Sequence, residues 1–311
     1  MNILVLGAAG FIGTNLVIRL AKNTDNRIIV VDEKSDFFGD IRKFSFSNVI
    51  EIESPLNEKT NFDYLDGIDL VYHLVSTNTP TTSNKHISND LQANISFSLK
   101  MLDACIKYNV PKVIFLSSGG TVYGKEFECP LSEDTPTSPI TSYGVQKLTI
   151  EKLLYLYNYI YGLDYRIIRL SNPYGPYQRP NGILGAVTTF TYKALKKEEI
   201  QVFGDGSIVR DFIFIDDAIT GIINITNGYS EYKIFNLGCG YGISINDVLK
   251  TIKLTLDMEL NVKYCASREV DLPINYLNIE RYEKEYGKLN PKSLADGIHI
   301  TAEYMKREVL G

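Results

Sequence analysis

The chain has 311 residues, and its formal net charge is -5 at pH 7. Hydrophobic residues make up 44% of it and charged residues 22%, a balance that excludes large-scale disorder and a disulfide scaffold. The length suits one large α/β domain, or such a domain with a smaller appendage. A mildly acidic surface argues against nucleic acid or an anionic membrane as the main partner.

Cysteine and histidine are scattered along the chain and form no metal-binding or redox spacing. The four cysteines are Cys105, Cys129, Cys239 and Cys265. We therefore expect no metal site, and we expect free thiols in a reducing compartment. The first residues are typical of a strand and a turn rather than a signal peptide, and no apolar run reaches membrane-spanning length. These features predict a cytoplasmic protein.

The first half of the chain alternates apolar strand patterns with helical ones. Short apolar runs predict buried strands at residues 3–6, 27–31, 70–75, 113–117 and 165–170. Apolar residues at helical spacing predict helices at residues 11–21, 91–108 and 142–162. Apolar strands separated by helices indicate an α/β fold, a doubly wound parallel sheet covered on both faces. After Leu170 the turn residues become dense, so we expect a domain boundary there.

Three glycines, Gly7, Gly10 and Gly13, join the first predicted strand to the first helix. Gly7 allows a tight turn, Gly10 allows the backbone to approach a pyrophosphate, and Gly13 allows the helix to pack closely. The helix N-terminus offers unpaired N–H groups and a partial positive charge to that anion. Asp32 ends the second strand, where a carboxylate would bind ribose hydroxyls and repel a 2′-phosphate. This pattern predicts NAD rather than NADP.

Tyr143 and Lys147 are four residues apart in a predicted helix, so they share one face. A nearby ammonium favours the phenolate, and we therefore expect Lys147 to lower the pKa of Tyr143. The segment from Ser117 to Gly124 follows a strand and can bring a hydroxyl beside the tyrosine.

These motifs, with Arg169–Pro176 and Arg210–Phe212, occur in an order that resembles the extended short-chain dehydrogenase/reductases. Within them the chain is most similar to NAD-dependent nucleotide-sugar epimerases and dehydratases, above all the UDP-glucose (UDP-galactose) 4-epimerases. The resemblance implies a Rossmann-type domain at residues 1–170, rejoined by about 207–237. It also implies a smaller C-terminal α/β domain for the nucleotide sugar at residues 171–206 and 238–311.

The resemblance also implies the residues of each binding site. Catalysis would use Tyr143, Lys147, Thr121 and Ser118. Contacts with NAD are expected from Gly7, Gly10, Phe11, Ile12, Gly13, Asp32, Leu74, Ser117, Tyr143 and Lys147. Contacts with a nucleotide sugar, in the first place a UDP-sugar, are expected from Asn172, Phe203, Arg210, Arg268, Asp271 and Asn275.

The segment before Tyr123 distinguishes between two reactions of similar enzymes. Related 4,6-dehydratases carry Thr-Asp-Glu there, whereas this chain has Gly119-Gly120-Thr121 and no acid. An elimination needs a general acid and an epimerisation does not, so the sequence favours C4 epimerisation. Many 4-epimerases have a hydroxyl at the position of Gly119, and here Thr121 or Ser118 would have to supply it.

Other functions stay open at this point. A 4-keto-sugar reductase would often use NADPH, which Asp32 disfavours, and a 4,6-dehydratase on a dTDP- or GDP-sugar would need the missing acid. A catalytically silent NAD-binding module is a third alternative, against which the presence of Tyr143, Lys147, Arg210 and Arg268 speaks.

Two further expectations follow from the resemblance. Asn275 stands where strict hexose epimerases have a large tyrosine, so N-acetylhexosamines could enter. Similar enzymes form homodimers through the helix that carries Tyr143 and Lys147. Its far end carries tyrosines, which suit a helix interface as well as a core-facing helix: Tyr155, Tyr157, Tyr159 and Tyr161.

Overall fold

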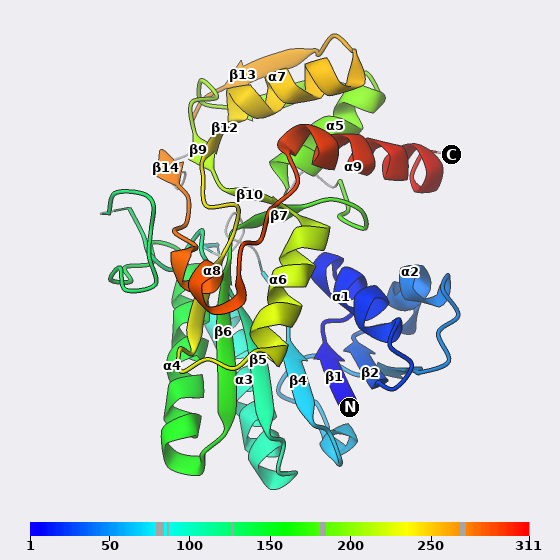
Figure 1. The fold of residues 1–311 in the computed structure, drawn as a ribbon, viewed down its shortest axis with the longest axis vertical. Helices are drawn as coiled ribbons and strands as arrows, with labels where there is room; N and C mark the ends of the chain where they lie inside the picture. The colour runs from blue at the N-terminus through cyan, green and yellow to red at the C-terminus, as the bar shows by residue number, and fades with distance from the viewer. Residues whose placement is uncertain (79–83, 86, 126, 181–184, 268–271, 311) are drawn as a thin grey trace. The chain divides into compact units, whose positions relative to one another are not determined.

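The structure is a computed structural model that describes residues 1–78, 84–85, 87–125, 127–180, 185–267 and 272–310 (Figure 1). These residues cluster into two compact units. The first unit consists of residues 1–122, 139–169 and 229–234, and the second of residues 123–138, 170–228 and 235–311. The assignment of one ligand to residues 1–170 with 207–237, and of the other to residues 171–206 with 238–311, stays a prediction.

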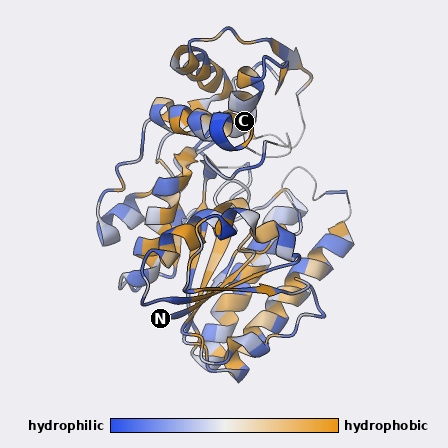
Figure 2. Cartoon of the chain, turned by 90° about the vertical axis from the view of Figure 1, so that its right-hand side faces the viewer, coloured by the Kyte–Doolittle hydropathy of each residue, from blue (hydrophilic) through white to orange (hydrophobic). Residues whose placement is uncertain are grey.

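A parallel sheet forms the centre of the fold. Among the described residues it has seven strands, in the order β11 (Ile234–Leu237), β6 (Asp164–Leu170), β5 (Lys112–Ser118), β4 (Leu70–His73), β1 (Asn2–Leu6), β2 (Arg27–Asp32) and β3 (Val49–Glu53). The pairs β1–β2, β1–β4, β2–β3 and β4–β5 run parallel. Figure 2 shows the strands in the colour of hydrophobic residues, as expected for strands buried on both faces. The predicted doubly wound α/β sheet is confirmed.

Helices cover this sheet. Helices α3 (Ile87–Lys107) and α4 (Ser142–Tyr161) pack against each other, and their Phe97, Met101, Ile150 and Leu154 share one buried cluster with side chains of β1, β4 and β5. Helix α1 (Phe11–Ala21) contacts β1 and β2. The remaining short elements of this unit are η1 (Ser35–Phe38), α2 (Gly39–Arg42) and η2 (Asp63–Leu65).

Two predicted boundaries differ from the observed ones by more than one residue. Helix α3 begins at Ile87, four residues earlier than predicted, because Ile87 is followed by three polar residues and its first turn gives no apolar repeat. Strand β4 ends at His73, two residues earlier than predicted. Helix α4 ends at Tyr161 because Gly162 adopts a left-handed conformation with φ 75°, and its N–H donates to the carbonyl of Asn158.

The second unit contains short strands and five helices among the described residues. Strands β7 (Asn172–Tyr174) and β10 (Phe212–Phe214) pair in parallel. The other sheets join β12 (Ile243–Ser244), β9 (Val209–Arg210) and β14 (Ile274–Asn275), and β13 (Val262–Cys265) with β8 (Ile200–Phe203). The helices are α5 (Ala186–Leu195), α6 (Ile215–Asn227), α7 (Ile245–Leu256), α8 (Glu280–Tyr286) and α9 (Leu294–Glu308).

Candidate active site

The glycine turn of the first unit leaves no room for side chains. Gly7 has φ +79°, and its N–H donates to the carbonyl of Val31 over 2.9 Å. A Cβ on Gly13 would lie 2.4 Å from the carbonyl oxygen of Gly7 and 2.6 Å from that of Ala8. Gly10 precedes the first turn of α1 and gives it no side-chain cap. The backbone N–H groups of that turn therefore remain available to an anion.

Asp32 and Leu74 lie beside this turn. One Asp32 carboxylate oxygen accepts from Ala9 N and the other from Glu33 N, each over 2.9 Å. The backbone of Leu74 would be 3.2 Å from a Cβ on Gly7, so the end of β4 supports the turn from the other side. A backbone cradle without side chains, an uncapped helix N-terminus and a fixed carboxylate fit the pyrophosphate and ribose of NAD. Phe11 and Ile12 belong to the first turn of α1.

Tyr143 and Lys147 lie one turn apart on α4, as the spacing predicts. The Lys147 ammonium is 5.6 Å from the centre of the Tyr143 ring, and its Nζ donates to the carbonyl of Leu116 over 2.8 Å. Burial lowers the pKa of Lys147 to about 8, while the charge of Glu151 opposes that shift. Burial raises the pKa of Tyr143 to about 12. The prediction that Lys147 lowers the pKa of Tyr143 is therefore wrong for the chain by itself, because the effect of burial on this pKa exceeds that of the Lys147 ammonium.

The three hydroxyls of Ser117, Ser118 and Thr121, at the end of β5 and in the turn that follows, have different surroundings. The Ser117 hydroxyl donates to the Glu151 carboxylate over 2.5 Å. Ser118 is half-buried at the end of β5, and its carbonyl accepts from the N–H of Thr121 over 3.4 Å. The Thr121 hydroxyl is buried and has no hydrogen-bond partner among the described residues. A Cβ on Gly144 would lie 2.6 Å from the Thr121 carbonyl, so this turn packs against the start of α4. Thr121 therefore has an unpartnered hydroxyl in a turn that packs against Gly144, the residue after Tyr143.

The second unit brings together two of the predicted substrate residues. Arg210 and Asn275 are register partners on the adjacent strands β9 and β14. A guanidinium N–H of Arg210 donates to the carbonyl of Leu272 over 2.6 Å. Asn275 is 2% exposed, and its side-chain N–H₂ has no partner among the described residues. Such a buried donor is ready for a ligand oxygen.

Asn172 and Phe203 lie elsewhere in the same unit. The side chain of Asn172 donates to the carbonyl of Asp211 over 2.9 Å, which ties it beside Arg210 in the chain. Phe203 is half-buried at the end of β8, where the following turn approaches Ser267. The predicted phosphate and ribose ligands Arg268 and Asp271 lie outside the described residues.

Asp211 joins several backbone segments of this unit. Its buried carboxylate accepts from the backbone N–H groups of Cys239, Gly240 and Leu277 over 2.7, 3.3 and 3.4 Å. Burial raises its pKa to about 6, against the lowering by these hydrogen bonds. Asp211 therefore connects the Arg210 strand with two other segments.

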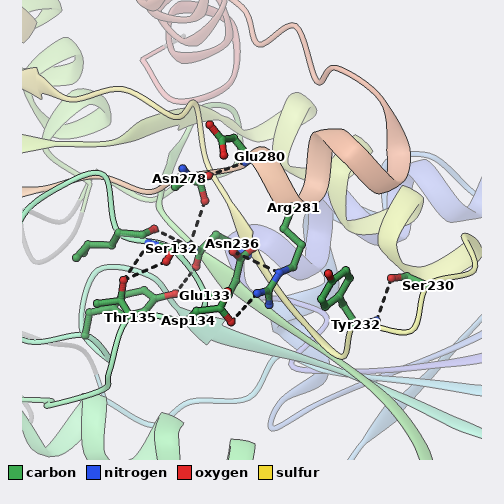
Figure 3. Close-up of polar contacts among 12 residues, drawn as sticks. Ser132, Glu133, Asp134, Thr135, Ser230, Tyr232, Asn236, Asn278, Glu280 and Arg281 are labelled. Carbon is green, nitrogen blue, oxygen red and sulfur yellow. Dashed lines mark hydrogen bonds and ion pairs between the residues drawn. The ribbon is translucent and has the colours of Figure 1, made fainter.

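The segment that follows the Thr121 turn is fixed by a polar cluster (Figure 3). The backbone N–H of Asn236 donates to Glu133 over 2.8 Å, and the Tyr123 hydroxyl donates to the side-chain oxygen of Asn236 over 2.6 Å. Arg281 pairs with Asp134 over 2.7 Å and approaches Glu133 to 3.6 Å. Sequence reasoning missed this cluster, because its contacts join residues 123–134 to residues that come at least a hundred positions later in the chain.

The part of the chain that the structure describes has neither a membrane-spanning helix nor a metal cluster. No helix there is long and apolar enough to cross a bilayer. No group of three or more His, Cys, Asp or Glu side chains is arranged there to hold a metal ion.

Comparisons with known proteins agree on one family. The model of the NAD dependent epimerase/dehydratase family matches residues 3–238. A putative UDP-glucose 4-epimerase of Methanocaldococcus jannaschii is 32% identical over 305 residues, which cover 98% of each chain. The crystal structure of UDP-glucose 4-epimerase from Thermotoga maritima with UDP-glucose is 32% identical, with a TM-score of 0.89 over 99% of each chain. UDP-N-acetylglucosamine 4-epimerase from Methanobrevibacter ruminantium, in complex with UDP-N-acetylmuramic acid, is 28% identical, with a TM-score of 0.91 over 99% of each chain.

Proposed function

Because the chain belongs to the NAD dependent epimerase/dehydratase family, we propose that it epimerises C4 of a UDP-hexose or a UDP-N-acetylhexosamine. The observation that carries this proposal is the catalytic turn itself. Tyr143 and Lys147 share a helix face, and residues 119–121 contain no acid. The unpartnered hydroxyl of Thr121 lies in the turn that packs against Gly144, the residue after Tyr143. These groups can move one proton to and from a sugar hydroxyl, and the turn adds no acid for the loss of a second hydroxyl.

The predicted catalytic residues of the first unit have separate tasks in this reaction. Tyr143 takes the proton of the sugar 4-OH, and after the 4-keto sugar has turned over it returns that proton. The Lys147 ammonium favours the phenolate during the transfer. Thr121, with Ser118 as the alternative, hydrogen-bonds the reacting oxygen. The glycine turn and Asp32 would hold NAD, which would supply the acceptor and donor of the C4 hydride.

The second unit would hold the nucleotide sugar. Arg210 would bind the diphosphate through charge-assisted hydrogen bonds, together with Arg268. Phe203 would stack on the base, Asp271 would accept from the ribose hydroxyls, and Asn172 would donate to the diphosphate or the sugar. The unpartnered amide of Asn275 supports a contact of this residue with the sugar.

The size of residue 275 is expected to set the preference between hexoses and N-acetylhexosamines. Asn275→Tyr fills space at a position that is only 2% exposed, and it should lower turnover of UDP-N-acetylglucosamine relative to UDP-glucose about tenfold. Initial rates with both substrates give this ratio. The matched control is Ile274→Tyr, at a neighbouring residue that is 55% exposed, and it should leave the ratio unchanged. An unchanged ratio in Asn275→Tyr would sink the hypothesis.

We place the homodimer interface on α4. The helix exposes large apolar side chains, among them Tyr155 at 59%, Leu156 at 44%, Tyr159 at 79% and Ile160 at 55%. Tyr159→Asp should convert a dimer into single chains in light scattering, because it would bury an unpaired carboxylate at the interface. Tyr229→Asp, at a residue that is 85% exposed elsewhere, should leave the dimer intact. A Tyr159→Asp protein that remains dimeric excludes this interface.

The compartment is inferred from the thiols. All four cysteines are free, two of them buried, and unpaired cysteines are typical of reducing compartments. We therefore place the enzyme in the cytoplasm.

Turnover tests the proposed function. The chain would be incubated with catalytic NAD⁺ and a panel of UDP-, dTDP- and GDP-hexoses, and the products would be followed by proton NMR. We expect a UDP-sugar to give its C4 epimer as the one product. A 4-keto-6-deoxy product would identify a dehydratase instead. Reduction of a 4-keto sugar at the expense of reduced cofactor would identify a reductase, and no turnover would favour the silent NAD-binding module.

A further inference from the structure

A third charged residue continues the helix face of Tyr143 and Lys147. Glu151 lies four residues after Lys147 on α4, so the three side chains follow one another turn by turn. Glu151 is only 3% exposed. A carboxylate that deep inside a protein requires partners, and the reaction proposed above gives it none.

The partners of Glu151 come from two strands of the same unit. Arg169 on β6 donates to both carboxylate oxygens, through Nε over 3.1 Å and Nη2 over 2.7 Å. The Ser117 hydroxyl, near the end of β5, donates to the first of these oxygens over 2.5 Å. Arg169 is 4% exposed, so this is a buried ion pair with an added hydrogen bond. The Glu151 carboxylate of α4 is therefore held in place by strands β5 and β6.

The other groups around Lys147 bring no negative charge among the described residues. From β5 it meets the Leu116 carbonyl and the Phe115 ring, 4.8 Å from the ring centre. From β4 it faces His73, whose pKa is lowered to about 3 by burial and by the Lys147 charge, so this imidazole is neutral. Tyr143, whose pKa is raised by burial in the chain by itself, adds no negative charge there. The remaining charge, the Arg169 guanidinium, is positive and is engaged by Glu151.

We propose that Glu151 is a positioning residue: its carboxylate, held by Arg169 and Ser117, keeps the buried Lys147 side chain an ammonium beside Tyr143. Burial alone acts in the opposite direction on Lys147. Ser117 then serves the site through Glu151, in addition to its predicted contact with NAD. The role in catalysis rests on the proposed epimerisation, whereas the effect on Lys147 does not.

Two variants separate the charge of Glu151 from its packing. Glu151→Gln keeps the shape and removes the charge, and Glu151→Asp keeps the charge and shortens the side chain. The protonation of Lys147 would be followed by NMR of the full chain labelled with ¹⁵N-lysine, with the signal assigned by its loss in Lys147→Arg. We expect a midpoint near pH 8 in the unchanged chain. It should fall by about one pH unit in Glu151→Gln and by no more than about a third of that in Glu151→Asp.

Activity provides the second readout. The alkaline limb of the kcat/KM profile should move to lower pH with the Lys147 midpoint in Glu151→Gln and stay in place in Glu151→Asp. If Glu151 serves packing alone, both variants lose thermal stability while the midpoint and the limb stay unchanged, and this result overturns the proposal. If Glu151→Gln does not fold, the double variant Glu151→Gln with Arg169→Met leaves no unpaired guanidinium, and its Lys147 midpoint should lie below that of Arg169→Met, which keeps the carboxylate.

The two proposals fail in different ways. The NMR midpoint needs no substrate, so it decides the effect of Glu151 on Lys147 whether or not the chain turns over a sugar. Absence of turnover in the unchanged chain contradicts the proposed function. An identical Lys147 midpoint in Glu151→Gln and the unchanged chain contradicts the positioning role.

Discussion

Replacing Tyr143 by phenylalanine is expected to lower kcat for C4 epimerisation about a thousandfold. The variant loses the one hydroxyl that takes and returns the substrate proton, while its phenyl ring still occupies the place of the Tyr143 ring. Lys147 cannot take over, because its ammonium is held by the Leu116 carbonyl and has no proton-accepting form until the pH approaches its pKa of about 8. Rates at saturating UDP-sugar near pH 7 measure the effect.

The control for this variant lies on the same helix. Tyr155→Phe removes a hydroxyl from a side chain that is 59% exposed, three turns further along α4, and should keep the full rate. Thermal stability should remain close to the unchanged chain in both variants, and Tyr155→Phe should also keep its affinity for NAD⁺. A Tyr143→Phe protein with more than about a tenth of the original rate would show that another group moves the proton.

Gly13→Ala is expected to weaken NAD⁺ binding between about 10- and 100-fold. The added Cβ would lie 2.4 Å from the carbonyl oxygen of Gly7 and 2.6 Å from that of Ala8. Both neighbours are backbone atoms of the turn that is to receive the pyrophosphate, so the turn itself has to move. Overpacking of this kind costs about 1–3 kcal/mol, and each 1.4 kcal/mol corresponds to a factor of ten in affinity.

Gly39→Ala is the matched control for the glycine turn. Gly39 lies in a short helix with φ -49°, and a Cβ there meets nothing within 4 Å. This variant should bind NAD⁺ like the unchanged chain, as titration calorimetry would measure. Equal NAD⁺ affinity in Gly13→Ala and Gly39→Ala would exclude the glycine turn as the dinucleotide site.

The sheet could be predicted because its strands carry their own signal. Parallel strands buried on both faces are apolar runs, and the runs at β1, β2 and β5 stop where a glycine, an acid or serines begin. The second unit gives no such signal. Its strands β9, β12 and β14 are two residues long, which is too short for any periodicity to be visible.

The candidate site could be predicted where its functional residues lie close together in the sequence. Tyr143 and Lys147 are one turn apart, and the glycines share a single turn, so spacing alone indicated both. Long-range contacts could not be predicted from the sequence. The Ser117 hydroxyl donates to Glu151, 34 residues away, and no local pattern indicates that pair. The four-residue spacing from Lys147 to Glu151 indicates that Glu151 shares their helix face, but it does not identify Ser117 as its partner.

The predicted direction of the Tyr143 pKa shift was wrong for a related reason. Sequence spacing shows which charge is near the phenol, but it does not show how far the ring is removed from water. Burial decides the sign here and raises the pKa to about 12.

The fate of the hydrogen at C4 tests the central claim most directly. The chain would be given catalytic NAD⁺ and UDP-galactose carrying deuterium at C4, in ordinary water, and the products would be followed by deuterium and proton NMR. The account predicts UDP-glucose with the deuterium retained at C4, because the hydride leaves and returns while only the hydroxyl proton passes through Tyr143. Epimer without deuterium, or no epimer from this or any other UDP-sugar, would contradict it.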